Sequence, residues 1–158
     1  MKRVLCVLCV LCALCVHGAV PRAQSASEKA DALSDAARKG DAAAVKTLLD
    51  EGVDVNTKFR YDRTALSFAA DRGHVDVVKV LLERGADVTM KDTFYNATAL
   101  TWAVSPAMDR KPQHTDVVRL LLDHGGFSAD ALKAALQAAT RAKLTDVVAL
   151  LEKAGARP

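Results

Sequence analysis

The stretch TALSFAADRGHVDVVKVLLERGADV, residues 64–88, decides the fold because much of it recurs along the chain. Its beginning returns as TALTWAV at residues 98–104, thirty-four residues later, with tryptophan in the place of phenylalanine. Its end is related to LLDEGVDVN at 48–56, LLDHGGFS at 121–128 and LLEKAGAR at 150–157. Recurrence at a period near thirty-three residues predicts a stack of similar structural units.

Within each unit, the apolar residues have the spacing expected of two helices. In the second helix of the quoted stretch, one face carries the apolar side chains Val75, Val78, Leu81 and Leu82. The opposite face carries Asp76, Lys79 and Glu83. This is the pattern of an amphipathic helix, and glycine at position 85 follows its last turn, where a left-handed residue commonly ends a helix. One unit cannot bury its apolar stripe alone, whereas four stacked units make a continuous core.

The order T-x-L, A-A, G-H-x-D-V-V and L-L-x-x-G-A-D-V resembles the ankyrin repeat. The resemblance covers residues 28–156, with repeats at about 28–58, 59–91, 92–127 and 128–156. It implies an all-α solenoid of about four helix-turn-helix repeats with hairpin-like turns, whose two end repeats act as caps. It also implies that the chain is not an enzyme and binds a partner protein through its concave face.

Three departures from the family pattern are visible. The usual T-P-L-H is T-A-L-S at residues 64–67 and T-A-L-T at 98–101, so we expect looser repeat starts. Repeat three carries an insertion at residues 105–112, whose two prolines prevent a continuous helix. The connection after Gly125 is shorter than the others, so we expect no full turn projection there.

The first 25 residues have the pattern of a signal peptide. Two basic residues precede an apolar run at 4–16, which is shorter than the roughly 20 residues that span a membrane. We therefore expect a small exported bacterial protein, periplasmic or secreted, with its repeat domain at 26–158 and no stable membrane anchor after cleavage. An uncleaved anchor is the alternative. Ser25 and Glu28 also form a capping-box pattern, which cleavage after Ser25 would remove.

Cysteine usage and charge limit the mature chain further. All four cysteines lie within the apolar run, so the mature domain has none to form a disulfide. The chain has 22 Lys and Arg against 19 Asp and Glu, and cleavage after Ser25 leaves 19 of each. A neutral chain has no whole-molecule attraction to nucleic acid. We expect a monomer that binds no nucleic acid.

No motif indicates catalysis. The chain has no Gly-x-Ser-x-Gly and no phosphate-binding loop, and its mature part has no cysteine nucleophile. His74 and His114 occupy the same repeat position and predict helix starts, because equivalent positions lie a helix pair apart, too far to share a metal. We expect no metal and no cofactor. The glycosylation pattern at Asn96 is interpreted as accidental, since Thr98 fills a helix-start position.

Aromatic residues single out two turns. Four of the seven aromatic residues lie at 58–63 and 91–97, although turn tips are usually polar. In the resembled family such turns project beside the first helices and form part of the binding face. Aromatic residues and arginine are also the favoured composition of interface hot spots. The predicted partner-binding residues are Phe59, Arg60, Tyr61, Arg63, Arg72, Phe94, Tyr95, Trp102, Arg110 and Lys111.

Two questions stay open at the level of sequence. Phe68 and Trp102 fit either packing between adjacent first helices or binding, and the rings of the turns fit packing on one another. The partner is expected to be another protein, bound by an exported adaptor or accessory protein. The alternative is a non-protein envelope ligand such as a cell-wall polymer.

Overall fold

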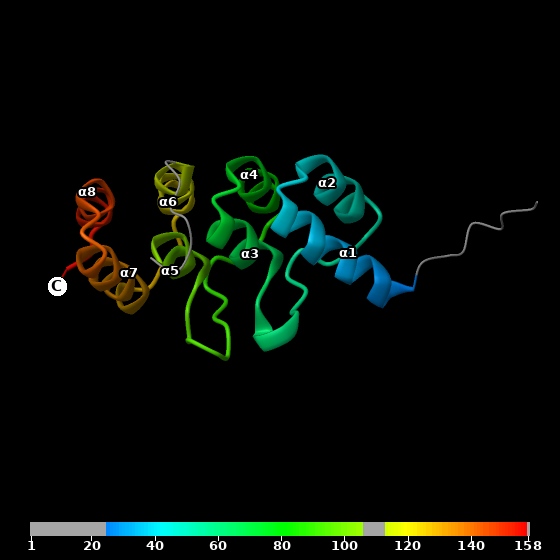
Figure 1. The fold of residues 1–158 in the computed structure, drawn as a ribbon, viewed down its shortest axis with the longest axis horizontal. Helices are drawn as coiled ribbons and strands as arrows, with labels where there is room; N and C mark the ends of the chain where they lie inside the picture. Colours follow the sequence, from blue (N-terminus) through cyan, green and yellow to red (C-terminus); the bar gives the residue numbers. More distant parts are fainter. Residues whose placement is uncertain (1–24, 106–112, 158) are drawn as a thin grey trace, which may run out of the picture.

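The computed structural model describes residues 25–105 and 113–157, which form a two-layered stack of helix pairs (Figure 1). The pairs are α1 (Ala26–Lys39) with α2 (Ala42–Asp50), α3 (Ala65–Arg72) with α4 (Val75–Glu83), α5 (Ala99–Val104) with α6 (Gln113–His124), and α7 (Ala129–Arg141) with α8 (Thr145–Lys153). A short 3-10 helix, η1 (Arg60–Asp62), lies in the first long turn. The described residues contain no strand, so the predicted all-α solenoid is confirmed.

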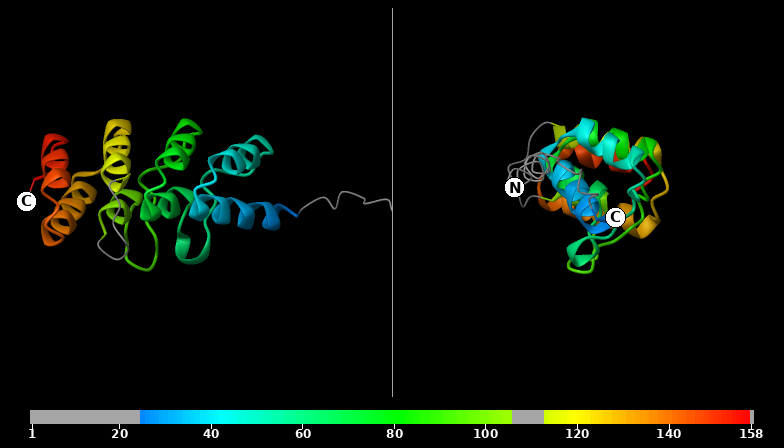
Figure 2. Two further views of the ribbon diagram at one scale, coloured as in Figure 1. Left: turned by 45° about the horizontal axis from the view of Figure 1, so that its top comes forward. Right: turned by 90° about the vertical axis from the view of Figure 1, so that its right-hand side faces the viewer.

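The helices form two rows along the stack. Helices α1, α3, α5 and α7 contact one another in order and form the inner row, while α2, α4, α6 and α8 form the outer row. Two long turns, before α3 and before α5, extend beyond the inner row (Figure 2). We call residues 58–63 the first finger and residues 91–97 the second finger. The connection after Gly125 has no such projection, as its length predicted.

The core follows the repeated apolar positions. Each helix pair contributes fully buried leucine or valine side chains, among them Leu33, Leu66, Leu81, Leu100, Leu121 and Leu151. The stripe predicted on α4 is largely correct, because Val78 and Leu81 are buried while Asp76 and Lys79 are exposed. Val77 is buried as well, which widens the stripe toward the neighbouring outer helices.

Side-chain caps begin the inner helices. At α3, Thr64 accepts a hydrogen bond from the backbone N–H of Ser67, and Ser67 accepts one from the N–H of Thr64. This reciprocal cap satisfies two N–H groups that a helix start leaves unpaired. The expected loosening of the repeat start is therefore offset at α3. Ser25 and Glu28 form the predicted capping box at α1.

Two histidines join successive repeats. His74 is the N-cap of α4 and its Nε2 donates to the carbonyl oxygen of Arg38, at 3.0 Å. His114 lies in the first turn of α6 and its Nε2 donates to the carbonyl oxygen of Asp71, at 3.1 Å. Each ring thus binds the end of the inner helix in the preceding repeat. The prediction of helix-start residues is confirmed, and the inter-repeat bond adds their structural purpose.

Close packing around these rings requires glycine. Gly73 ends α3 in the left-handed conformation, with φ of 72°. A Cβ atom at this position would lie 2.9 Å from the ring of His114. Both the backbone conformation and the ring therefore exclude a larger residue.

In the described parts of the chain, no helix is long and apolar enough to cross a membrane. Most of the insertion of repeat three, including Arg110 and Lys111, lies outside the described residues, as do the first 24 residues.

Candidate functional site

The two fingers form one continuous unit. The first finger is closed by a hydrogen bond from the N–H of Phe59 to the carbonyl of Arg63, at 2.8 Å. The second is closed by a bond from the N–H of Asp92 to the carbonyl of Ala97, at 3.1 Å. A third bond joins them, because the N–H of Thr93 donates to the carbonyl of Tyr61, at 2.9 Å. The fingers therefore position each other, and the predicted hairpin-like turns are present.

Behind the fingers, cations and rings alternate along the inner row. The guanidinium of Arg38 on α1 lies 4.0 Å from the ring centroid of Phe68 on α3. The guanidinium of Arg63 lies 4.4 Å from the same centroid and 4.0 Å from that of Trp102 on α5. We call these four side chains the cation–ring row. Each cation–π contact stabilises the row by about 0.5–1 kcal/mol where exposed and more where desolvated.

Arg63 is the central residue of this row. Its Nη2 donates to Asp71 Oδ2 and to the carbonyl of Ser67, both at 3.2 Å. Burial lowers the pKa of the Arg63 guanidinium from its ordinary value, and the nearby carboxylate of Asp71 opposes that shift. Arginine is not deprotonated in proteins, so the Arg63 side chain keeps its positive charge. Because its plane contacts the rings of Phe68 and Trp102 and its Nη2 is hydrogen-bonded within the protein, Arg63 joins repeats two and three.

Asp92 organises the second finger. Its Oδ1 accepts hydrogen bonds from the N–H groups of Phe94 and Tyr95, at 2.9 and 2.6 Å. Its Oδ2 accepts from the N–H of Ala97 at 3.3 Å and from Trp102 Nε1 at 2.9 Å. One buried carboxylate thus holds both the finger backbone and the tryptophan of the next helix.

The ends of the fingers expose three rings. Tyr61, Phe94 and Tyr95 are 46%, 61% and 66% exposed, and they are the large hydrophobic residues that stand out as exposed among those described. The centroids of Tyr61 and Phe94 lie 5.3 Å apart, and those of Phe94 and Tyr95 lie 4.5 Å apart. We call these three rings the tip patch. The rings do pack on one another, which was one of the two alternatives left open by the sequence, yet more than half of Phe94 and of Tyr95 stays exposed to water.

Arg60 borders the tip patch, with its guanidinium 4.9 Å from the ring centroid of Tyr61. The backbone here is strained, because Tyr61 and Asp62 have φ values of 63° and 55°. A left-handed conformation is costly for residues other than glycine. The fold holds Tyr61 in this conformation, which places its ring against the second finger.

The predicted binding residues fall into four groups in the structure. Arg60, Tyr61, Phe94 and Tyr95 come together in and beside the exposed tip patch. Phe59, Arg63 and Trp102 are partly buried and pack behind it. Arg72 is exposed at the far end of α3 from the first finger, so it does not join the patch. Arg110 and Lys111 lie outside the described residues.

The role of Asp92 and the contact that Arg38 makes with Phe68 were not predicted. Asp92 looks from sequence like any polar turn residue, and nothing in its neighbourhood indicates four hydrogen bonds. Arg38 belongs to another repeat, and its stacking on Phe68 depends on how the repeats are packed. Phe68 itself is 5% exposed, which favours packing over binding for this ring.

A hollow of about 580 Å³ lies between α1 and the first finger. Its charged lining residues are Asp31, Asp35, Arg38, Lys58 and Arg60. Arg60 links the hollow to the tip patch, because it lines the hollow and its guanidinium lies over the ring of Tyr61. This arrangement places charged side chains next to exposed rings.

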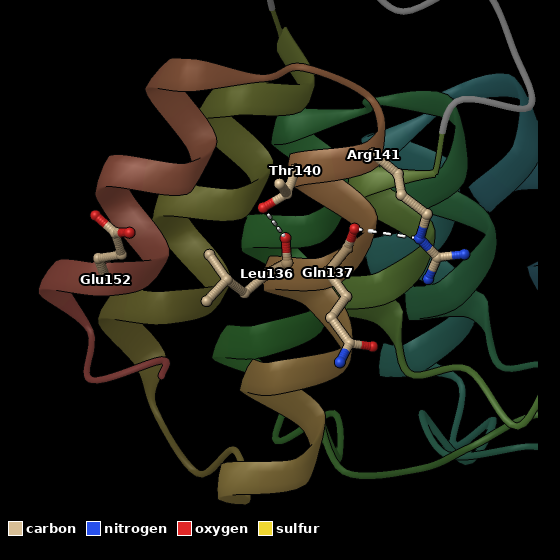
Figure 3. A pocket seen from close by; sticks show the side chains of 5 residues that line it. All are labelled: Leu136, Gln137, Thr140, Arg141 and Glu152. Atoms are coloured by element: carbon tan, nitrogen blue, oxygen red, sulfur yellow. Dashed lines mark hydrogen bonds between the residues drawn. The ribbon is translucent and has the colours of Figure 1, made fainter. Parts of the chain in front are cut away.

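A second hollow, of about 440 Å³, lies on the last helix pair (Figure 3). It is lined by Leu136, Gln137, Thr140, Arg141 and Glu152. The hydroxyl of Thr140 donates to the carbonyl of Leu136 and Arg141 Nε donates to the carbonyl of Gln137, both within α7. These polar groups are engaged by their own helix, as expected for a cap at the end of a stack. Among the described residues, no three potential metal-ligating side chains form a group.

Comparison with protein families agrees with this architecture. A family model for ankyrin repeats in three copies matches residues 6–92. A model for a single ankyrin repeat matches residues 95–134. Comparison with curated proteins gives no match.

Proposed function

Because the chain belongs to the ankyrin-repeat family, we propose that it binds another protein through its concave face and finger tips, without a reaction of its own. Ankyrin repeats generally mediate interactions between proteins and are typically not enzymes. We further propose that this chain is an exported adaptor or accessory protein, periplasmic or secreted, that acts as a monomer. The resemblance of residues 1–25 to a signal peptide supports export.

The exposure of the tip patch carries the binding proposal. Three aromatic rings stand at adjacent finger ends, and more than half of Phe94 and Tyr95 is in contact with water. Their mutual packing explains their position but leaves apolar surface that the fold does not bury. Contiguous exposed apolar surface beside polar residues marks interaction sites on soluble proteins.

The binding proposal is tested by cross-linking in the host, followed by identification of the cross-linked protein and reconstitution from purified components. The double variant Tyr61→Ser/Tyr95→Ser should lose the reconstituted complex, because hot-spot residues contribute about 2 kcal/mol or more. Lys79→Ser on the outer face of α4 serves as the control and should retain it. Equal binding by the double variant would show that the site lies elsewhere, and a purified envelope polymer bound in place of a protein would overturn the protein-partner proposal.

Export is tested separately by the intact mass of the protein recovered from the host envelope and medium. The mature chain should begin between residues 19 and 27. Recovery outside the cytoplasm with the first methionine still attached would contradict cleavage, and recovery only in the cytoplasm would contradict export.

A further inference from the structure

Three cations on and behind the fingers have no carboxylate partner among the described residues. Within residues 25–105 and 113–157, no ion pair engages the exposed side chains of Arg38, Arg60 or Lys91. The guanidinium group of Arg38 lies over the ring of Phe68, and that of Arg60 lies over the ring of Tyr61. Both line the hollow beside α1, so their charges face the same open space.

Within the described residues, the carboxylates of the two fingers and of α3 are already engaged. Asp71 pairs with Arg63, and Asp62 lies 4.0 Å from Lys58. Asp92 accepts four hydrogen bonds from its own finger and from Trp102. The fingers therefore present unpaired positive charge directly beside the exposed rings, and a bound carboxylate would compensate it.

Two carboxylates that have no cation partner among the described residues limit the negative charge that such a ligand can carry. Asp31 and Asp35 lie one helical turn apart on α1 and line the far side of the hollow from the fingers. They repel a second negative charge placed along the hollow. A uniformly acidic chain is disfavoured, whereas a single carboxylate next to an apolar side chain fits both the cations and the rings.

From this arrangement we propose the chemistry of the partner, a step that rests on the proposed function. The bound element is an extended segment of a partner protein in which an Asp or Glu adjoins an aromatic or large aliphatic residue. The carboxylate binds between Arg38 and Arg60, and the apolar side chain packs on Tyr61, Phe94 and Tyr95. Aromatic packing supplies most of the affinity, while the cations set the preference for the acidic residue.

The probe is a displayed library of random linear peptides, selected on the full mature protein. Selected peptides should be enriched in an acidic residue next to an aromatic or aliphatic one. Synthetic copies are then titrated against the protein by fluorescence anisotropy at low and high NaCl. Affinity should fall with salt, because exposed charge pairs are screened.

Three protein variants separate the contributions. Arg38→Gln/Arg60→Gln should weaken peptide binding roughly tenfold, as expected for loss of charge-assisted hydrogen bonds. Replacing the acidic residue of the peptide by its amide should weaken wild-type binding similarly but leave the affinity of this double variant unchanged. Phe94→Ser should weaken binding tenfold or more. Lys79→Gln, on the outer row, should bind as the wild type does. Arg60→Gln alone, at an exposed site, repeats the test should the double variant unfold.

The outcomes distinguish this inference from the proposed function. Peptides without acidic enrichment whose binding still depends on Phe94 would overturn the inference and leave the binding face intact. Binding that neither Phe94→Ser nor the arginine variants change would overturn both. A library that returns no binding peptide would overturn the inference that the ligand is a linear segment.

Discussion

Asp92→Ala offers the sharpest test of how the fingers are built. The substitution removes an acceptor from four donors, of which the N–H groups of Phe94 and Tyr95 belong to exposed residues and can bind water instead. The N–H of Ala97 belongs to a buried residue, and Trp102 Nε1 is partly buried. A buried donor left without a partner costs about 1–3 kcal/mol. Because one of these two donors is only partly buried, the sum falls in the lower part of its range, and we expect a loss of roughly 2–4 kcal/mol in the free energy of unfolding.

Asp92→Asn provides a graded comparison. The amide keeps one oxygen acceptor but places an NH₂ group against the other pair of donors. It should therefore destabilise by about half as much, roughly 1–2 kcal/mol. Lys91→Ala, at the exposed neighbouring position, should stay within about 0.5 kcal/mol of wild type.

The assay is denaturant unfolding followed by circular dichroism and by tryptophan fluorescence. The chain has a single tryptophan, so its emission reports directly on the hydrogen bond from Trp102 to Asp92. Asp92→Ala should change the emission of the native state as well as the unfolding midpoint. Midpoints and native emission equal to those of Lys91→Ala would refute the assignment of Asp92 as the organiser of the finger.

Three further predictions concern stability. Leu81→Ala, at a fully buried position, should cost roughly 2–5 kcal/mol, whereas Lys79→Ala should stay within about 0.5 kcal/mol in denaturant unfolding. Gly73→Ala should lower the melting temperature more than Gly52→Ala, since both have positive φ but only Gly73 faces a histidine ring; equal losses would argue against that ring contact. Hydrogen bonds from the side chain and the backbone N–H of Thr89 lower the pKa of Asp87. Its carboxylate therefore stabilises the fold above the ordinary aspartate pKa, and this stabilisation is lost as the pH falls through the lowered pKa of the folded state. Asp87→Asn should therefore lower the melting temperature near pH 7 but not near pH 2, and a constant difference would contradict this linkage.

The fold could be predicted because each repeat restates the same physical requirements. The apolar positions of residues 75–83 and the glycine after them recur along the chain and predict the helices and their ends. The short connection after Gly125 predicts the missing turn projection. The exposure of Tyr61, Phe94 and Tyr95 could be anticipated as well, because turn tips have little protein above them. Local pattern was sufficient wherever the structure is local.

The site was harder to predict wherever contacts cross repeats. Arg63 is of a residue type that is common in binding sites, yet its long side chain pairs with Asp71 and lies between the rings of Phe68 and Trp102. Arginine is compatible with both exposure and burial, and the choice depends on a ring thirty-nine residues away along the chain. Arg72 does not lie beside the fingers, because it is at the C-terminal end of α3 and the first finger precedes the N-terminal end. That Arg72 belongs to the same repeat as the first finger does not show this separation.

The same contacts that hold the stack together also determine which residues are left for binding. Arg63 binds Asp71 on α3, and Asp92 accepts a hydrogen bond from Trp102 on α5, so both charges hold the fingers to the helices. Neither residue can pair with a ligand without loosening these contacts between repeats. Arg60 and the outer faces of the tip rings make no comparable contribution to the core, and a ligand can use them at little cost to the fold. The hydrogen bond from Thr93 to Tyr61 fixes the spacing between the fingers before any partner arrives. A preordered surface loses less entropy on binding, so the rigid inner contacts raise the affinity of the exposed ones without touching the ligand.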